Sequence, residues 1–251
     1  MKESHHKVHL CLTRRGFLVL FFFVFYPSQP AQAELNWKVR EIVKDQSSTT
    51  HLTDNQGNRY KKVSVPNIRT IWRIFHDVSS KAELTADLII VRGNAPNAFA
   101  KGLGSNIIGI NFGMLDLVGE DVNIWANLLG HEFAHLKLSH SLAGIKRGIP
   151  LAILGELIER KVEKRQVKEL LGLTTQAIDS HYSQEQESDS DYLGAIWALE
   201  AGFSPWGAVE LHKRLLSLTG TDNYPDFLKS HPSSEKRIKR LSKLARRLES
   251  K

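Results

Sequence analysis

The sequence predicts an α+β fold that is mainly helical, with a small sheet beside a central helix. Short apolar runs bounded by turn-forming residues lie between positions 86 and 113, and such runs are typical of strands. From position 121 onward, apolar residues instead recur with the spacing of amphipathic helices. The 251 residues contain no internal repeat, which favours one globular core over a solenoid.

The first half of the chain is expected to supply the strands. Residues 34–65 are polar, and the turn sequence DNQGN at 54–58 predicts a short hairpin or an irregular arm. Pro66 then opens a helical pattern. The apolar face of that helix comprises Ile68, Ile71, Trp72, Phe75 and Val78. Three strands are predicted at 86–93, 97–100 and 105–113.

The second half is expected to be helical. A helix that starts at Asp121 would bury Ile124, Leu128, Leu129, Phe133 and Leu136. Gly148 and Pro150 interrupt the segment 143–174, whose second half has the pattern of a charged helix. Further helices are predicted at 175–200, at 205–218 and in the basic C-terminal stretch that ends the chain.

The N-terminus has the pattern of an export signal. Arg14 and Arg15 precede an apolar run, and Ala31-Gln32-Ala33 follows it as a cleavage sequence. The run from Gly16 to Tyr26 is about half of the roughly 20 residues that a membrane-spanning helix needs. We therefore expect residues 1–33 to be a signal peptide that is removed. An uncleaved anchor and export by the twin-arginine route are the alternatives that the residues leave open.

The charge of the protein is concentrated at its C-terminus. The formal net charge is +7, and residues 229–251 alone carry nine basic and two acidic side chains. The remainder of the chain after residue 33 is mildly acidic, so the protein lacks the broad basic surface of a nucleic-acid-binding protein. The only cysteine, Cys11, lies in the predicted signal, which leaves the exported part without a disulfide.

Three polar residues in the apolar helix after Asp121 indicate metal chemistry. His131 and His135 are four residues apart, so their imidazoles project from one helix face and can reach a common ion. Glu132 lies between them, where it can act on water as a general base without ligating the metal. The alternative is a pair of helix histidines that are hydrogen-bonded to carbonyl groups.

A third ligand is sought in the acidic run SQEQESDSDYLG at 183–194. Glu187 and Asp191 are four residues apart on the next long helix, so Glu187 could complete a two-histidine, one-glutamate site. Asp191 could then accept the outer N–H of His131 and fix its tautomer. By pattern alone, Glu185 competes with Glu187, because it too has an acidic residue, Asp189, four positions on. A solvated acidic face is the alternative reading of the run.

Four stretches together resemble the HtpX-like and CAAX-prenyl-protease family of zinc metallopeptidases, in its soluble, exported bacterial branch. They are NAFA at 97–100, GHEFAH at 130–135, the acidic run at 183–194 and HPSSEKRIKRL at 231–241. The resemblance implies a zincin-type metallopeptidase domain at 66–251 with one Zn²⁺ per chain. It assigns Glu187, and not Glu185, as the third ligand. It also brings His231 near the metal, as an oxyanion stabiliser or as a plug in the fourth position.

These features predict an exported zinc endopeptidase in the periplasm. Substrate would lie extended along the strand that contains Asn97, Ala98, Phe99 and Ala100, where main-chain pairing tolerates many sequences. Such tolerance favours unfolded or misassembled envelope proteins as substrates. A zinc-stabilised chaperone or binding protein with little proteolysis is the alternative. His140 and His181 are expected to lie on the surface.

The basic C-terminal helix suggests a second kind of partner. Its apolar residues fall on one face, with most of the lysines and arginines elsewhere, and such a helix can bind anionic lipid. The predicted apolar face comprises Ile238, Leu241, Ala245 and Leu248. A packed helix with a solvated basic face is the other interpretation.

Overall fold

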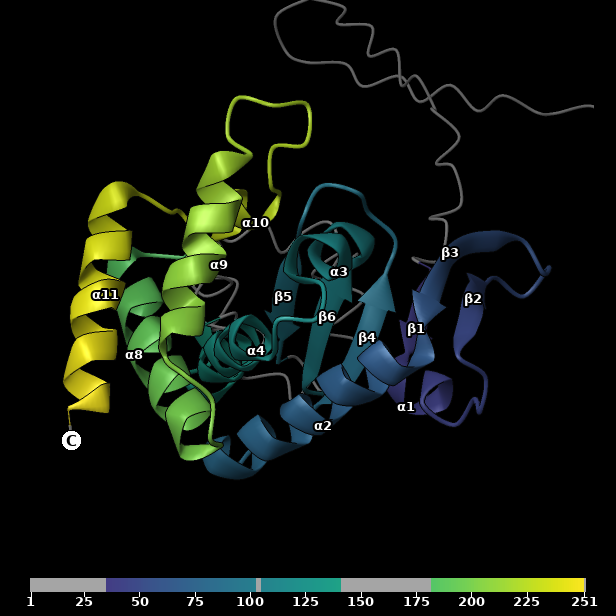
Figure 1. Ribbon diagram of the computed structural model, residues 1–251, viewed down its shortest axis with the longest axis horizontal. Coiled ribbons are helices and arrows are strands. Elements are labelled where there is room, and N and C mark those ends of the chain that lie inside the picture. The colour runs from purple at the N-terminus through teal and green to yellow at the C-terminus, as the bar shows by residue number, and fades with distance from the viewer. Residues whose placement is uncertain (1–34, 103–104, 141–181, 251) are drawn as a thin grey trace, which may run out of the picture. The chain divides into compact units, whose positions relative to one another are not determined.

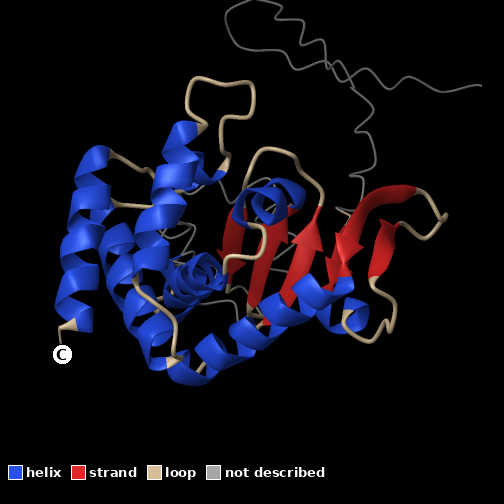
Figure 2. Ribbon diagram, viewed as in Figure 1, coloured by secondary structure: helices blue, strands red, loops and turns tan. Residues whose placement is uncertain are grey.

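The predicted α+β class is confirmed in a computed structural model that describes residues 35–102, 105–140 and 182–250 (Figure 1). The proposed signal at 1–33, the whole segment 143–174 and His181 lie outside the described residues. Figure 2 shows the C-terminal helices gathered beyond one edge of the sheet and a separate hairpin beyond the other.

The polar segment after residue 34 contributes to two sheets. Its hairpin is formed by β2 (Thr49–Thr53) and β3 (Arg59–Ser64), and Asp54 stabilises the predicted turn by accepting from the backbone N–H groups of Gln56 and Asn58. Before the hairpin, β1 (Asn36–Lys38) and the short α1 (Val39–Ile42) form. Because β1 pairs with a strand of the main sheet, the segment is an integral part of the fold and not an irregular arm.

The main sheet has the order β1-β4-β6-β5, with β4 (Asp87–Val91) parallel to β6 (Ile107–Asn111) and β5 (Ala98–Lys101) antiparallel at one edge. The predicted strand at 105–113 was too long. The Asn111 side chain accepts from the backbone N–H of Met114 and so caps the start of α3 (Phe112–Val118). This helix was not predicted from the sequence, because its first residues continue the apolar run of the strand.

The helix with the histidine pair is α4 (Val122–Lys137), and it is the centre of the fold. Asp121 caps its N-terminus by accepting from the backbone N–H of Ile124. Every residue from Ile124 to Leu136 is buried. The helix packs against β5, against α2 (Val65–Ala82) and against two later helices. A helix buried on all sides holds its polar side chains away from bulk water.

The later helices are α8 (Gln184–Glu200), α9 (Trp206–Ser217), the short α10 (Phe227–Ser230) and α11 (Glu235–Glu249). The helix predicted over 175–200 does not run through Tyr182 and Ser183. Ser183 is instead an N-cap, and its side chain and that of Gln186 form a reciprocal capping box. No helix within the described ranges is both long enough and apolar enough to cross a membrane.

On α11, the predicted apolar face is used for packing. Leu241 and Ala245 are buried, and the helix contacts α8 and α9. Ile238 and Leu248 are half-buried, whereas Lys239, Lys243, Arg246 and Arg247 are exposed. The apolar stripe therefore faces the protein core, and the surface of the helix is cationic.

Two glycines let the backbones of α4 and α8 approach each other closely beside the candidate site. A Cβ added to Gly130 would lie 2.6 Å from the carbonyl oxygen of Gly194, and a Cβ added to Gly194 would lie 2.6 Å from the backbone nitrogen of His131. Any side chain would therefore force the two backbones apart. The close approach brings the ligand candidates of the two helices within reach of one another.

We expect Gly194→Ala to destabilise the protein, because overpacking against backbone atoms costs about 1–3 kcal/mol and exceeds the gain of roughly 1 kcal/mol in helix propensity. The melting temperature should fall by several degrees, and metal affinity should fall with it as Glu187 moves away from His131. Differential scanning calorimetry and metal titration measure both quantities. Asp189→Ala, at an exposed position of the same helix, is the control. An unchanged melting temperature for Gly194→Ala would contradict the packing argument.

Candidate metal centre

Four buried donors from three separate parts of the chain converge beside α4. His131 and His135 come from α4, Glu187 comes from the first turn of α8, and His231 directly follows α10. One ligand atom from each of these residues lies within 4.8 Å of all the others. The sequence prediction that Glu187 meets the histidine pair therefore agrees with the structure, whereas the competing Glu185 is exposed.

The distances between the donor atoms suit a single small cation. His131 Nε2 lies 3.0 Å from His135 Nε2 and 3.2 Å from His231 Nδ1. Glu187 Oε1 lies 3.3 Å from His135 Nε2 and 2.9 Å from His231 Nδ1. Tetrahedral ligands at about 2.0–2.1 Å from an ion are themselves roughly 3.3 Å apart. The three nitrogens and one oxygen thus have the spacing and chemistry of a zinc-type ligand set.

Glu132 adds a second observation that the site is built for a polar ligand. Its side chain is fully buried, and neither carboxylate oxygen has a hydrogen-bond partner among the described residues. The nearest ionisable partner is His231, whose Nε2 lies 3.7 Å from Oε1. Burial raises the pKa of Glu132 above its ordinary value. Buried polar atoms are nearly always hydrogen-bonded, so a carboxylate left without partners indicates a bound polar group.

Asp191 lies where the sequence predicted it. Its Oδ1 is 3.2 Å from Nδ1 of His131, the ring nitrogen that faces away from the donor cluster. A carboxylate at the outer nitrogen fixes the tautomer and the orientation of a ligating imidazole. Asp191 is buried, one helical turn after Glu187 on α8, so both carboxylates approach α4 from the same side.

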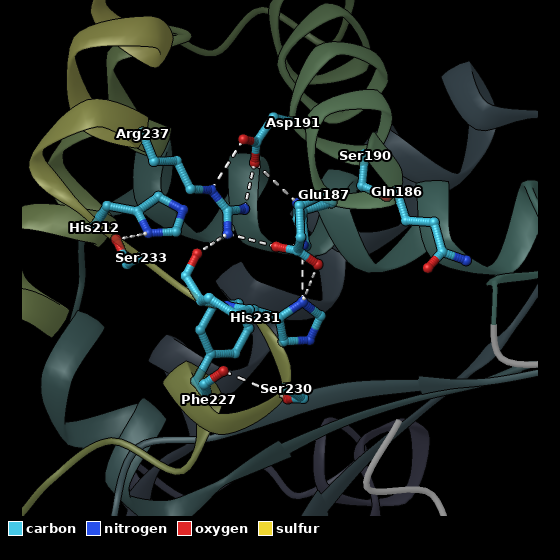
Figure 3. Close-up of polar contacts among 12 residues, drawn as sticks. Gln186, Glu187, Ser190, Asp191, His212, Phe227, Ser230, His231, Ser233 and Arg237 are labelled. Atoms are coloured by element: carbon cyan, nitrogen blue, oxygen red, sulfur yellow. Dashed lines mark hydrogen bonds and ion pairs between the residues drawn. The ribbon is translucent and has the colours of Figure 1, made fainter. Parts of the chain in front are cut away.

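Arg237 is a member of the site that the sequence reasoning missed. Figure 3 shows its guanidinium between the carboxylates of Asp191 and Glu187, with His231 on the far side of Glu187. Arg237 donates to both oxygens of Asp191 at 3.0 and 2.6 Å, and to Glu187 Oε2 at 2.5 Å. Glu187 thus turns one oxygen toward the histidines and the other toward the arginine. Arg237 was detectable in principle, because it falls in register with the buried Leu241 and Ala245 on α11.

The electrostatics of this buried group are governed by charge pairing. Burial alone would raise the pKa of Asp191, but the Arg237 guanidinium outweighs it and holds the pKa below its usual range. For Glu187, the neighbouring His231 and His131 likewise overcome burial and lower the pKa. Burial lowers the pKa of His135 well below the ordinary value for histidine. Ionised carboxylates and a neutral His135 are the forms in which these residues ligate a metal.

The prediction that His140 lies on the surface is wrong. Helix α4 ends at Lys137, and Ser139 takes a left-handed conformation with φ 55°, which turns the chain back onto the helix. His140 is therefore buried, with its Nδ1 3.0 Å from Nδ1 of His135. It occupies the outer side of His135 as Asp191 does for His131. The ring of Tyr182 stacks on His135 at a centroid distance of 3.9 Å, a contact that no sequence pattern indicated.

The strand proposed for substrate borders a groove that reaches the cluster. The groove has a volume of 370 Å³ and is lined by Asn97, Phe99, Ala100 and Lys101 on one side and by Ser230 and His231 on another. Asn97 directly precedes β5, and β5 is an edge strand of the sheet. Ala98 is buried in the core and is not among the residues that line the groove. An extended peptide could pair with the main chain of this edge.

Comparisons with known proteins support a metallopeptidase. The family model described as Peptidase family M48 matches residues 66–245, which confirms the resemblance that the sequence motifs indicated. The chain is 28% identical to the mitochondrial metalloendopeptidase OMA1 of Arabidopsis thaliana over 168 residues, which are 66% of this chain and 33% of that protein. It is 29% identical to the metalloprotease YcaL of Escherichia coli over 167 residues, which are 57% of this chain and 65% of that protein.

A third relative is the mitochondrial metalloendopeptidase OMA1 of Saccharomyces cerevisiae, 25% identical over 154 residues, which are 59% of this chain and 43% of the yeast protein. The matches thus span between one third and somewhat under two thirds of the length of these relatives.

Proposed function

The chain belongs to peptidase family M48, and from this premise we propose that it is a zinc-dependent endopeptidase. The observation that carries the proposal is the convergence of His131, His135, Glu187 and His231 beside the buried carboxylate of Glu132, which has no hydrogen-bond partner among the described residues. The nitrogen-rich donor set, the spacing of its atoms and its burial all favour zinc over harder cations such as Mg²⁺ or Ca²⁺.

In the proposed mechanism Glu132 transfers the proton, and neighbouring residues hold the metal ligands in position. When bound, the cation supplies Lewis acidity, which polarises the scissile carbonyl and makes water nucleophilic near neutral pH. Glu132 takes the proton of the attacking water and delivers it to the leaving amine. Asp191 and Arg237 keep His131 and Glu187 in place.

The substrate part of the proposal rests on the edge strand. We assign unfolded or misassembled polypeptides as substrates, since pairing along β5 uses main-chain groups that every extended chain presents. Export by residues 1–33 would deliver the enzyme to the periplasm, where such substrates are envelope proteins. N-terminal sequencing of the protein after export tests this location, and a first residue other than Glu34 would contradict cleavage after Ala33.

We expect a chelator to abolish hydrolysis of casein by the purified protein, and we expect stoichiometric Zn²⁺ to restore it, because the four converging donors would hold the ion that activates water. Release of casein fragments measures activity, and metal analysis by mass spectrometry measures loading. Mg²⁺ added after chelation is the control and should restore nothing. Hydrolysis that continues in a protein verified to be metal-free would contradict the proposal.

A zinc-stabilised binding protein with little proteolysis is the second candidate. It is favoured by Nδ1 of His231, which completes a four-donor set and so occupies the position that a catalytic zinc keeps open. Comparing casein hydrolysis by the wild type and by His231→Ala separates the two candidates. Activity that appears or rises in the variant indicates a plugged peptidase. Zinc-loaded protein that binds casein and cleaves it in neither form supports the binding protein.

A further inference from the structure

A second cleft, between α8 and α11, ends at the metal-ligand candidate Glu187. Its volume is 580 Å³, and Tyr182 lines both this cleft and the groove beside β5. The two helices that form it pack against each other at the C-terminal end of the fold (Figure 1). The part of its lining that is not cationic comprises Tyr182, Gln184, Glu187, Pro232, Ser233 and Ser234. The second cleft therefore borders the candidate active site at Tyr182 and Glu187.

One wall of the second cleft is a row of cations on α11. Lys236, Lys239, Arg240 and Lys243 all line it. Arg240 donates to Asp191, and the buried Arg237 below them is paired with Asp191 and Glu187. Among the described residues, the three lysines have no carboxylate partner. Among the described lining residues, Glu187 alone is acidic, and its charge is already engaged by Arg237.

The spacing of the lysines makes their positive charge unfavourable within the helix. Lys239 and Lys243 are four residues apart, and like charges at that separation on a helix repel. The row thus carries positive potential into a concave cleft, where neighbouring low-dielectric walls focus the field. A negatively charged occupant would relieve the repulsion.

We propose that the second cleft binds an acidic segment of the polypeptide substrate, so that the enzyme prefers peptides that carry Asp or Glu beyond the cleaved bond. This inference rests on the proposed peptidase function and adds a substrate class to it. A peptide is favoured over a lipid surface, because the lysines line a concavity that reaches Glu187, whereas a membrane requires an exposed, protruding face. The three lysines, which have no carboxylate partner among the described residues, match several carboxylates on one extended chain.

The test compares two fluorescent peptides of one sequence, which differ only in having three Glu or three Gln residues on one side of the scissile bond. Binding is measured by fluorescence anisotropy on the zinc-loaded Glu132→Gln protein, so that no turnover intervenes. We expect the Glu peptide to bind about three- to tenfold more tightly at low salt, and this preference should disappear at high salt.

Lys243→Glu and Arg247→Glu are the matched variants, because they make the same charge change one helical turn apart on α11. Lys243 lines the second cleft, whereas Arg247 is exposed outside it. We expect Lys243→Glu to remove the preference for the Glu peptide and Arg247→Glu to retain it. Equal loss in both variants, or equal affinity of the wild type for both peptides, would overturn the proposal.

Two further outcomes distinguish the acidic-peptide site from a membrane-binding surface and from a failure of the peptidase proposal. Binding to phosphatidylglycerol vesicles that both variants weaken equally, without discrimination between the peptides, would assign the cations to a membrane and overturn the peptide site. If wild-type protein loaded with zinc cleaves neither peptide while Lys243→Glu still abolishes selective binding, the cleft proposal stands and the peptidase proposal fails. The two failures are thus distinguishable.

Discussion

Glu132→Gln is expected to retain its metal and lose about two to four orders of magnitude in kcat, which is the range contributed by general acid–base catalysis. The metal should persist because the oxygens of Glu132 are not among the four converging donors. The amide has the same shape as the carboxylate and cannot take a proton from water. Metal analysis and hydrolysis of a fluorogenic peptide, both on the same preparation, measure the two effects.

The stability of this variant provides an internal check. Glu132 is buried without a hydrogen-bond partner in the described part of the chain, so its replacement by a neutral amide should not lower the free energy of unfolding. Loss of activity could then not be ascribed to unfolding. Glu185→Gln, an identical change at an exposed position of α8, is the matched control and should behave as the wild type. Near-normal kcat in Glu132→Gln would eliminate the assigned base.

Arg237→Met should be the most destabilising of the substitutions considered, with a loss of about 3–5 kcal/mol in the free energy of unfolding of the metal-free protein. The reason is that it leaves the carboxylates of Glu187 and Asp191 buried without their guanidinium partner. Bound zinc should reduce the loss, since a cation at Glu187 supplies part of the missing positive charge. Urea unfolding in chelator and in zinc measures both values.

Arg240→Met is the control for this prediction. Arg240 also donates to Asp191, at 2.9 Å, but its side chain is 45% exposed. Partly exposed ion pairs are screened by solvent and contribute about 0–1 kcal/mol, so this variant should lie close to the wild type. A difference of less than about 1 kcal/mol between Arg237→Met and Arg240→Met would show that burial of the arginine does not matter as argued.

The dependence of stability on pH follows from the ion pair between Arg237 and Asp191. Arg237 holds the pKa of Asp191 in the folded protein below the value of about 3.9 that an unfolded aspartate has. A group with a lowered folded-state pKa contributes stability above its unfolded pKa and loses that contribution as the pH falls. Metal-free wild type should therefore weaken below about pH 4, and Arg237→Met should show a shallower loss over the same interval.

The local geometry of the candidate site was predictable from sequence. Positions four apart on a helix share a face, and this rule places the imidazoles of His131 and His135 together and Glu187 one turn from Asp191. The residues alone did not choose between Glu185 and Glu187, because both have an acidic residue four positions on. That choice depends on which face of α8 is turned toward α4, and burial of Glu187 gives the answer.

Other sequence predictions were wrong at positions where a single residue changes the direction of the chain. The left-handed Ser139 folds His140 back onto His135, Asn111 converts the end of a strand into the start of α3, and Ser183 starts α8 later than its periodicity suggested. Hydrophobic periodicity averages over many residues and does not register such single-residue changes of direction. The positions of His140 and Tyr182 against His135 follow from them.

The sequence by itself determined the α+β class, the histidine pair with its glutamate, and the carboxylates that could meet them. These are properties of short segments, in which backbone geometry fixes the relation between neighbouring side chains. Only the tertiary structure decided that Nδ1 of His231 lies among the donor atoms, that Arg237 holds Glu187 and Asp191, and that lysines of α11 border a cleft that Glu187 also lines. Such relations arise from packing between elements far apart in the chain, because burial and charge pairing depend on which surfaces meet.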